Sequence, residues 1–425
     1  MMNARRQARK LDRDDPLRAF RDEFWLPRDP TAGAQLYFCG NSLGLQPRRL
    51  DDVLGQELEA WRELGVAGHF QGERPWVPYH EALREPLATL AGARPAEVVA
   101  MNSLTVNLHL AMASFYRPRG ARTRIVIERQ PFPSDRFAVE SQIRWHGLDP
   151  RDCLVELGDP GERLIDESRV EDYLAHHGEQ VALVLWPGVH YASGQRFDLA
   201  RISRAARAAG AHVGFDLAHS IGNVPLSLHD DGADFAAWCS YKYLNAGPGA
   251  VAGLFVHERH HGRDDLPRLH GWWGNDPDTR FAMGPEFRPA PGVAAWQISN
   301  PPILSMAPLR LSLELFAQAG MERLRQKSVA LTGYFEKSIQ EHLEELIEII
   351  TPADPGRRGC QLSLRVRSGR DAGHDLFRYL QVEGVVADWR EPDVIRVAPV
   401  PLYNSYEDCW SLVERISAWR EARDA

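Results

Sequence analysis

Two residues with reactive or charged side chains follow neighbouring segments of predicted strand. Asp216 closes the segment Ala211–Phe215, and Lys242 follows the segment Phe235–Cys239. Ligands of open α/β sheets bind beyond the carboxyl ends of the strands, so both side chains are expected at one site. A lysine amine can form a Schiff base with an aldehyde, and a carboxylate can keep a pyridine nitrogen protonated. The pair therefore suits the two ends of pyridoxal phosphate (PLP). An aspartate that caps a turn and a lysine exposed in a loop are the simpler alternative.

Two other segments offer groups that a phosphorylated ring requires. Asn102–Thr105 precede the apolar run Val106–Phe115, so Leu104 and Thr105 are expected at the start of a helix. Free backbone amides at a helix start bind phosphate. Phe132 follows the first predicted strand and can place its ring against a cofactor. Each segment can also be an ordinary helix cap or capped turn.

Arg396 lies inside the apolar strand candidate Val394–Val397 and must find a partner there. Its planar guanidinium fits a carboxylate in bidentate fashion, and a structural ion pair is the alternative. The chain has 16 histidines, but none shows the spacing of a metal-binding motif, so we predict no metal. Neither the phosphate-binding loop of nucleoside triphosphatases nor a Gly-x-Ser-x-Gly motif is present.

The middle of the chain alternates short β-branched runs with helical stretches, which predicts a mostly parallel α/β sheet. The run Val181–Trp186 is apolar throughout, as expected of a strand covered on both faces. The other strand candidates are Ile125–Ile127, Ala211–Phe215, Phe235–Cys239 and Val251–Val256, and predicted helices at Asp135–His146 and Leu199–Ala209 lie between them.

The pattern changes after about residue 305, where we expect a smaller α/β domain to begin. Pro308 is predicted as the first residue of a helix that ends near Gly320, and a second helix is predicted at Met321–Leu346. We predict three parts: an N-terminal segment (1–50) that packs with the small domain, a large cofactor-binding domain (51–305) and a small C-terminal domain (306–425). The first 30 or so residues are charged and irregular, so they are expected to fray or drape over the surface.

Charge and cysteine content exclude several classes of protein. The chain has 425 residues, 58 of them acidic and 50 basic, so its net charge of −8 provides no general field for nucleic acid. Five scattered cysteines without a Cys-x-x-Cys pair indicate a reducing compartment. No apolar run approaches the length of a membrane span. We therefore expect a cytoplasmic protein that binds neither nucleic acid nor membranes.

Five motifs, in this order, closely resemble those of kynureninase, a family of fold-type-I PLP enzymes related to aspartate aminotransferase. They are Tyr37–Gly44, Met101–His109, Phe132–Asp135, Asp216–His219 and Ser240–Lys242. The likeness extends from about Tyr37 to Tyr403, nearly the whole chain. Each motif alone is weak, but five in register are specific. The resemblance implies the fold-type-I α/β fold, with a mostly parallel sheet in the large domain and a smaller C-terminal α/β domain.

The resemblance also implies site residues. Lys242 would bind the cofactor aldehyde, Asp216 would pair with its ring nitrogen, and Tyr241 would donate a proton. The further cofactor contacts would be Leu104, Thr105, Phe132, Pro133, Ser134, Asp135, His219, Tyr241, Trp272 and Asn300, with Trp272 and Asn300 reaching in from a neighbouring subunit. Arg396 would hold the substrate carboxylate, helped by Asn41 or Ser42, and His69 and Asn300 would tune the preference for the aryl ring.

The implied reaction is hydrolysis of the β–γ carbon bond of L-kynurenine to anthranilate and L-alanine. The expected enzyme is a homodimer with a shared active site, and it acts in tryptophan catabolism and the kynurenine pathway, which also serves NAD biosynthesis. Its preference between kynurenine and 3-hydroxykynurenine stays open. The alternatives are another fold-type-I enzyme or a non-catalytic binding protein. A desulfurase would need a reactive loop cysteine, for which Cys360 is the nearest candidate.

Overall fold

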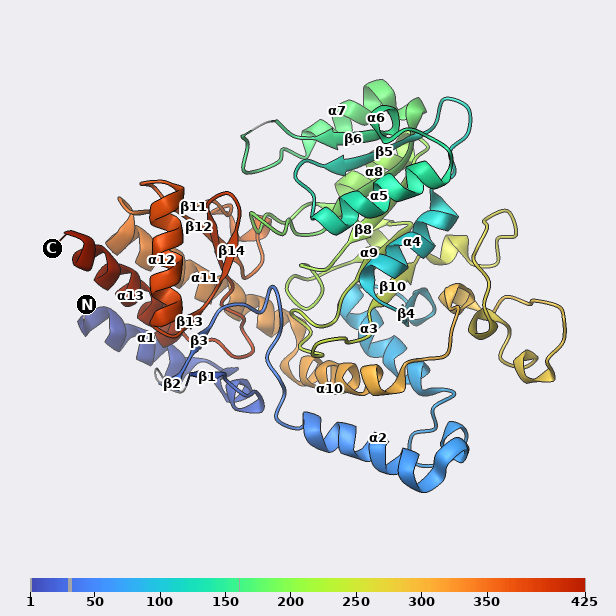
Figure 1. Cartoon of the computed structure of the whole chain (residues 1–425), viewed down its shortest axis with the longest axis horizontal. Helices are drawn as coiled ribbons and strands as arrows, with labels where there is room; N and C mark the ends of the chain where they lie inside the picture. Colours follow the sequence, from blue (N-terminus) through green and yellow to red (C-terminus); the bar gives the residue numbers. More distant parts are fainter. Residues whose placement is uncertain (1, 30–32, 160, 425) are drawn as a thin grey trace.

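Two sheets form the centres of the two halves of the chain (Figure 1). The computed structural model describes residues 2–29, 33–159 and 161–424. The larger sheet has the strand order β4-β10-β9-β8-β7-β5-β6, and β10 is antiparallel to both its neighbours while the other pairs are parallel. Its strands are β4 (Val98–Ala100), β5 (Arg124–Glu128), β6 (Leu154–Leu157), β7 (Val181–Pro187), β8 (His212–Asp216), β9 (Phe235–Trp238) and β10 (Gly253–Val256). The predicted mostly parallel sheet is confirmed, although β4 and β6 were not foreseen.

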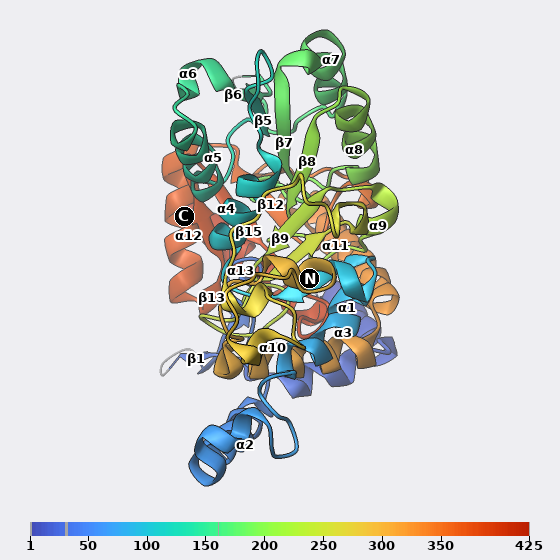
Figure 2. The ribbon, with the colours of Figure 1, turned by 90° about the vertical axis from the view of Figure 1, so that its right-hand side faces the viewer.

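Helices cover both faces of the larger sheet (Figure 2). Side chains alternate across a strand, so Val126 of β5 joins one apolar core while its neighbours Ile125 and Ile127 join the other. The first core includes α3 (Arg84–Ala91), α7 (Ser168–His177), α8 (Leu199–Ala208) and α10 (Ile303–Ala319), and the second includes α4 (Leu104–Phe115) and α5 (Pro133–Trp145). The remaining helices of this half are α2 (Leu50–Leu64), α6 (Pro150–Cys153) and α9 (Leu228–Asp231).

The smaller sheet is antiparallel and has the order β11-β12-β15-β14. Its strands are β11 (Ile347–Ile349), β12 (Leu362–Val366), β14 (Asp388–Arg390) and β15 (Val394–Val397), and its helices are α11 (Met321–Leu343), α12 (Arg370–Val382) and α13 (Tyr406–Asp424). The four-residue spacing along α11 is confirmed as a buried face, since Leu331, Phe335, Ile339 and Leu343 all lie in the core. Within the described ranges, no helix is both long and apolar enough to span a membrane.

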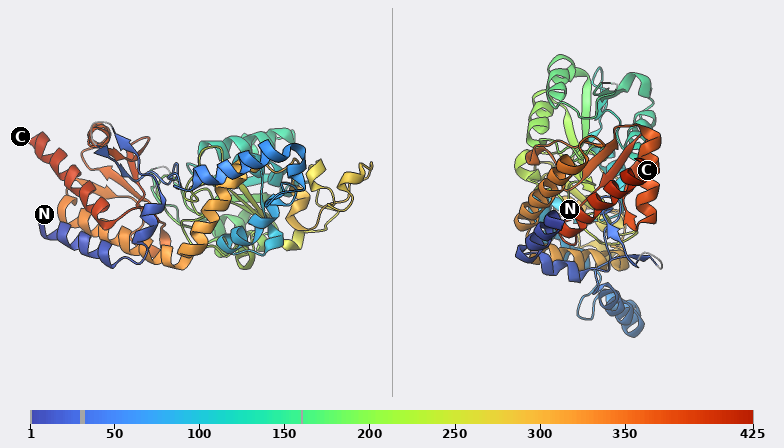
Figure 3. Two further views of the ribbon diagram at one scale, coloured as in Figure 1. Left: turned by 90° about the horizontal axis from the view of Figure 1, so that it is seen from below. Right: turned by 90° about the vertical axis from the view of Figure 1, so that its left-hand side faces the viewer.

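The expectation of a frayed N-terminus was wrong, because residues Met2–Asp14 form helix α1. This helix packs along α13 (Figure 3). It buries Ala8, and Arg9 pairs with Glu407. Asp12 accepts hydrogen bonds from the backbone N–H groups of Tyr406 and Glu407 at 2.7 and 3.0 Å, so it caps α13. The N-terminal charges that made the segment look irregular are thus the partners of another helix.

The segment between α1 and α2 also runs through short strands. β3 (Leu36–Tyr37) pairs in parallel with β13 (Val385–Val386), beside the smaller sheet, and β1 (Arg28–Asp29) pairs with β2 (Gly33–Ala34). The prediction for Pro308 was wrong, because it lies inside α10 rather than at its start. The loss of one backbone donor is tolerated there because the flanking side chains Met306, Ala307 and Leu309 are buried against the large half.

Candidate functional site

A cavity of about 200 Å³ opens where β5, β7 and β8 end. This is the place that the topology of a parallel sheet favours for a ligand. Both Asp216 and Lys242 line it, as the spacing of the strands predicted. The lining residues are Ser103, Leu104, Thr105, Glu128, Phe132, Ser134, Asp135, Pro187, Val189, Tyr191, Asp216, Ala218, His219, Tyr241 and Lys242.

The amine of Lys242 lies 3.2 Å from Nε2 of His219. Burial and the nearby Lys242 charge hold the pKa of His219 well below its ordinary value, so its imidazole is neutral and accepts this hydrogen bond. The proton of His219 is then on Nδ1, which is buried and has no partner among the described residues. An unpartnered donor in the cavity wall is available to an oxygen of a bound group.

Three carboxyl groups gather on the side of the cavity formed by β5 and β8. Asp216 ends β8 and accepts a hydrogen bond from the backbone N–H of Ala218 at 2.7 Å. Asp135 contacts Asp216, and both burial and that neighbouring carboxylate raise the pKa of Asp135. Glu128 ends β5, and burial raises its pKa to about 8. A cationic ring nitrogen suits such a cluster, because it would neutralise negative charge that the fold brings together.

Other groups in the cavity lining are suited to a phosphate. Ser103 precedes α4 and makes no capping bond with its side chain, so the first amides of the helix remain available. The hydroxyl groups of Thr105 and Ser134, both in the lining, lie 2.9 Å apart. Phe132 supplies an aromatic face nearby, with Lys242 Nζ 5.8 Å from the centre of its ring. Together the amine, acids, hydroxyls and aromatic ring fit the functional groups of PLP.

Arg396 lies next to this cavity on β15 and is 1% exposed. Its Nη1 donates to the backbone oxygen of Tyr191 at 2.8 Å, and its Nη2 donates to Ser42 Oγ at 3.0 Å and to the Asp388 carboxylate at 2.5 Å. The ion pair with Asp388 agrees with the structural alternative. The position of Arg396 beside the cavity also agrees with a role in binding a carboxylate. Asn41 is also buried and bonds to Gln361, which leaves its side-chain oxygen without a partner among the described residues.

Besides Arg396, Asn41 and Ser42, four more of the expected site residues lie outside the lining of this cavity: Trp272, Asn300, His69 and Pro133. Trp272 is 41% exposed and donates through its indole N–H to the backbone oxygen of Arg280. Asn300 is exposed and lines a separate pocket. His69 packs against Trp76 and Phe70, and Pro133 is exposed as the first residue of α5.

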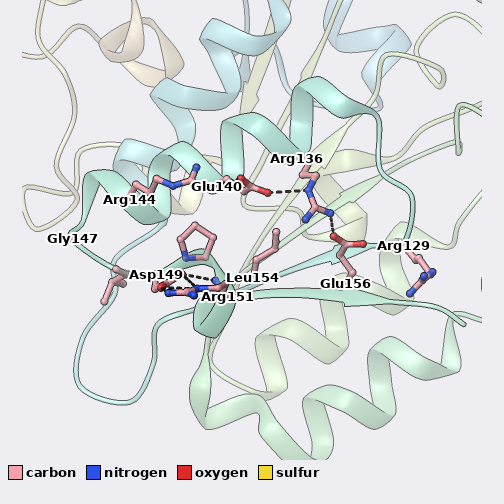
Figure 4. Close-up of a pocket in the computed structure, with 11 residues that line it drawn as sticks. Arg129, Arg136, Glu140, Arg144, Gly147, Asp149, Arg151, Leu154 and Glu156 are labelled. Atoms are coloured by element: carbon pink, nitrogen blue, oxygen red, sulfur yellow. Dashed lines mark hydrogen bonds and ion pairs between the residues drawn. The ribbon is translucent and has the colours of Figure 1, made fainter. Parts of the chain in front are cut away.

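A larger groove of about 800 Å³ lies away from the cavity, between α5, α6 and β6 (Figure 4). It contains four arginines, but Arg136 pairs with Glu140 and Glu156, and Arg144 also pairs with Glu140. Arg151 pairs with an aspartate two residues before it. The guanidinium charge in this groove is largely neutralised by the groove's own acids.

The fold also brings together histidines that the sequence spacing did not connect. Glu97 lies within 2.9 Å of His229 Nδ1 and 3.5 Å of His257 Nδ1. Its carboxylate also accepts backbone N–H groups of Arg94 and Glu258. A second group joins His212, Asp234 and His260. In both groups hydrogen bonds to the buried carboxylate account for the arrangement.

Comparisons with known proteins agree with this geometry. Residues 324–416 match the family described as the kynureninase C-terminal domain. A kynureninase of Xanthomonas campestris pv. campestris (strain B100) is 57% identical over 420 residues, which cover 99% of each chain. A kynureninase of Stenotrophomonas maltophilia (strain K279a) is 57% identical over 417 residues and 98% of each chain.

Solved structures share the fold at low sequence identity. A cysteine desulfurase from Thermococcus onnurineus NA1 superposes with a TM-score of 0.74 at 17% identity, over 91% of this chain and 95% of the other. The desulfurase CsdA from Escherichia coli gives 0.74 at 18% identity, over 96% and 98%. The fold-type-I fold is thus confirmed. Because the full-length identity to kynureninases is far above the level needed for common descent, the chain belongs to the kynureninase family.

Proposed function

We propose that this protein hydrolyses L-kynurenine, and also 3-hydroxykynurenine, to L-alanine and the corresponding anthranilate, with PLP as its cofactor. The observation that carries the proposal is the meeting of Lys242 and Asp216 in one cavity, whose lining also contains the start of α4 and the hydroxyls of Thr105 and Ser134. When bound there, PLP supplies an electron sink that stabilises negative charge on the substrate. Lys242 would hold the cofactor aldehyde, and the amine would later carry the proton removed from the substrate α-carbon.

Asp216 would keep the ring nitrogen protonated by placing a carboxylate beside it. His219 would hold Lys242 Nζ through the 3.2 Å contact and offer its unpartnered Nδ1–H to the cofactor. Tyr241 lines the same cavity, and burial raises the pKa of its phenol, so it remains protonated at neutral pH. It would therefore act as a proton donor as the carbon–carbon bond breaks.

Arg396 would fix the α-carboxylate of the substrate. Its guanidinium is buried, it bonds to the backbone of Tyr191 in the cavity wall, and its Nε has no partner among the described residues. A charged donor held rigidly beside the reacting carbon contributes through orientation. Asn41 and Ser42 flank it on the N-terminal segment.

We also propose that the protein is a homodimer whose two subunits share each active site. Trp272 and Asn300 lie outside the cavity of their own chain, which is expected if they serve the neighbouring one. Residues 50–70, which we name the arm, project from the molecule with helix α2 (Figure 2). The arm exposes large apolar side chains that a second copy would cover: Leu58, Trp61, Val66 and Phe70.

The three-part division of the chain and the cytoplasmic location remain proposals. The contacts of α1 and β3 with α13 and β13 support the assignment of residues 1–50 to the small domain. The five cysteines are all free, which supports a reducing compartment. A desulfurase activity is disfavoured because Cys360 is fully buried and burial raises the pKa of its thiol to about 12.

The decisive experiment loads the purified protein with PLP and follows anthranilate fluorescence after L-kynurenine is added. Lys242→Ala should abolish both turnover and the visible absorbance of the bound cofactor, because no other lysine lines the cavity. Lys327→Ala, at the buried pair with Asp15 in the other half of the chain, serves as a matched control for loss of a buried lysine. Turnover retained in Lys242→Ala would overturn the proposal.

A further inference from the structure

The Arg396 guanidinium is already paired with a carboxylate of its own chain. Asp388 and Arg396 are directly opposite each other on the antiparallel strands β14 and β15, and their side chains meet at 2.5 Å. Side chains opposite each other on neighbouring strands are held on the same face by the backbone ladder. The Asp388 contact is therefore fixed by the sheet itself.

The Asp388 carboxylate accepts hydrogen bonds from three side chains. One of its oxygens accepts from Arg396, from Arg390 at 3.0 Å and from the hydroxyl of Ser42. Its side chain is 9% exposed, and the other oxygen is buried without a partner among the described residues. Ser42 belongs to the N-terminal segment, so Asp388 links that segment to the small sheet beside the cavity.

The charges of this cluster are unequal. Two guanidinium groups, Arg390 and Arg396, share the single carboxylate of Asp388, which leaves one positive charge for an incoming anion. Of the five N–H donors of Arg396, three are used by Tyr191, Ser42 and Asp388, and Nε is among those left over. The cluster thus has the net charge and the unused N–H donors to bind one further carboxylate.

We propose that Asp388 is a positioning residue that holds Arg396 and Ser42 in the orientation in which they bind the α-carboxylate of the substrate. The inference rests on the proposed role of Arg396 and extends it to a residue with no contact to the reacting atoms. An arginine whose rotamer is fixed by a neighbouring carboxylate loses less freedom when it binds an anion.

The test compares two ligands of the PLP-loaded enzyme that differ only in the α-carboxylate: L-kynurenine, measured by KM and kcat, and its decarboxylated amine, measured as a competitive inhibitor. Asp388→Asn should raise KM for kynurenine about tenfold, as expected for a charge-assisted contact, with kcat changed less than about twofold. The inhibition constant of the amine should not change. Asp393→Asn, which alters a nearby ion pair with Arg163, is the matched control and should leave both constants unchanged.

Other results overturn the inference. If Asp388→Asn weakens the binding of kynurenine and of the amine equally, Asp388 has a general structural role. If KM for kynurenine is unchanged, Asp388 does not influence carboxylate binding by Arg396. Asp388→Glu keeps the charge but moves it by one methylene group. It should give an intermediate KM, and it carries the test if the asparagine variant does not bind PLP.

A separate variant tests the proposal that Arg396 binds the substrate carboxylate. If Arg396→Gln leaves KM for kynurenine unchanged, Arg396 is not the anchor, whatever Asp388 does. If Arg396→Gln raises KM, Asp388→Asn in that background should raise it no further, because Asp388 acts through Arg396. An additional increase would show that Asp388 acts independently and would contradict the inference.

Discussion

Glu128 is the least expected residue of the cavity, because a third carboxyl group joins two that already face each other. It is 4% exposed at the end of β5, where the neighbouring Asp216 carboxylate adds to the effect of burial in raising its pKa. Burial disfavours the charged form, so Glu128 is held as a neutral acid at pH 7. A neutral Glu128 adds no negative charge beside Asp216 in the cavity lining.

This raised pKa has a consequence for stability. The folded protein keeps a proton on Glu128 up to a pH of about 8, whereas the unfolded chain releases it near the ordinary value of 4.5. Stability is therefore lost as the pH rises between these two values, by at most about 1.4 kcal/mol for each pH unit. In Glu128→Gln this loss should disappear.

Chemical denaturation of the PLP-free protein at several pH values between about 5 and 8 measures the effect. The wild type should lose free energy of unfolding across this range more steeply than the variant, because only the wild type carries the buried Glu128 carboxyl group. Parallel slopes would show that Glu128 is already ionised in the folded protein.

The predictable part of the site consists of residues next to recognisable strand ends and motifs. Asp216, Lys242 and Arg396 are of this kind. Glu128 directly follows the predicted strand Ile125–Ile127 and ends the observed strand β5. This position was the signal that could have identified it, although a lone glutamate there is common at a surface. Asp388 could not be found from the sequence, because its significance depends on the register that places it opposite Arg396.

At the scale of elements, the N-terminal segment lies directly on the loop that carries Lys242. The backbone N–H of Gly44 donates to the oxygen of Tyr241 at 2.8 Å. A methyl group added at Gly44 would overlap the backbone oxygen of Lys242 and the α-carbon of Asn245. Only glycine permits this close approach between the two loops.

Gly44→Ala should therefore displace the Lys242 loop and weaken PLP binding at least about tenfold, because backbone at both sides must shift. Gly55→Ala is the matched control, since its added methyl group meets no other atom and it lies within α2. The control should be neutral or more stable by about 1 kcal/mol. Titration of each PLP-free variant with the cofactor measures the difference, and equal affinities would contradict the close contact.

The cap of α13 provides a test of how α1 contributes to the fold. Asp12→Ala removes the two hydrogen bonds to the N-terminus of α13 and should lower the free energy of unfolding by about 1 kcal/mol. Asp14→Ala, at an exposed position of the same helix, should change it little. Thermal or chemical unfolding compares the two variants, and an equal effect would show that the cap is unimportant.

The elements that could be predicted from the sequence are those whose apolar residues follow the pattern expected of a buried strand or helix. Strand β7 is apolar throughout and helix α11 is apolar at every fourth residue, so both could be placed. Helix α1 has a charged sequence, and its helical structure is explained only by its packing against α13. Pro308 lies inside α10 because tertiary packing outweighs the local preference of proline for the start of a helix. Local signals cannot report a partner that lies several hundred residues away.

At the scale of the whole molecule, sharing of the active site can be tested by mixing two inactive proteins. A Lys242→Ala protein retains Trp272, and a Trp272→Ala protein retains Lys242. If Trp272 serves the neighbouring subunit, a hybrid dimer contains one site with both residues intact and should regain activity. The mixture is unfolded, refolded together and assayed with L-kynurenine.

Each variant refolded alone is the control and should stay far less active than the mixture. If the mixture is no more active than the average of the two separate proteins, Trp272 acts within its own chain or not at all.

The projecting arm has a consequence for how the protein behaves when it is scarce. Trp61 is 60% and Val66 81% exposed in the single chain, and the proposed dimer would cover them. The fraction of chains in such a dimer would depend on protein concentration. If each catalytic centre needs both copies, the rate per molecule is not constant but declines on dilution below the dissociation constant. A substitution such as Trp61→Glu would then have the same effect as dilution. It should raise the protein concentration at which half of the specific activity is lost, without changing any group that contacts the substrate.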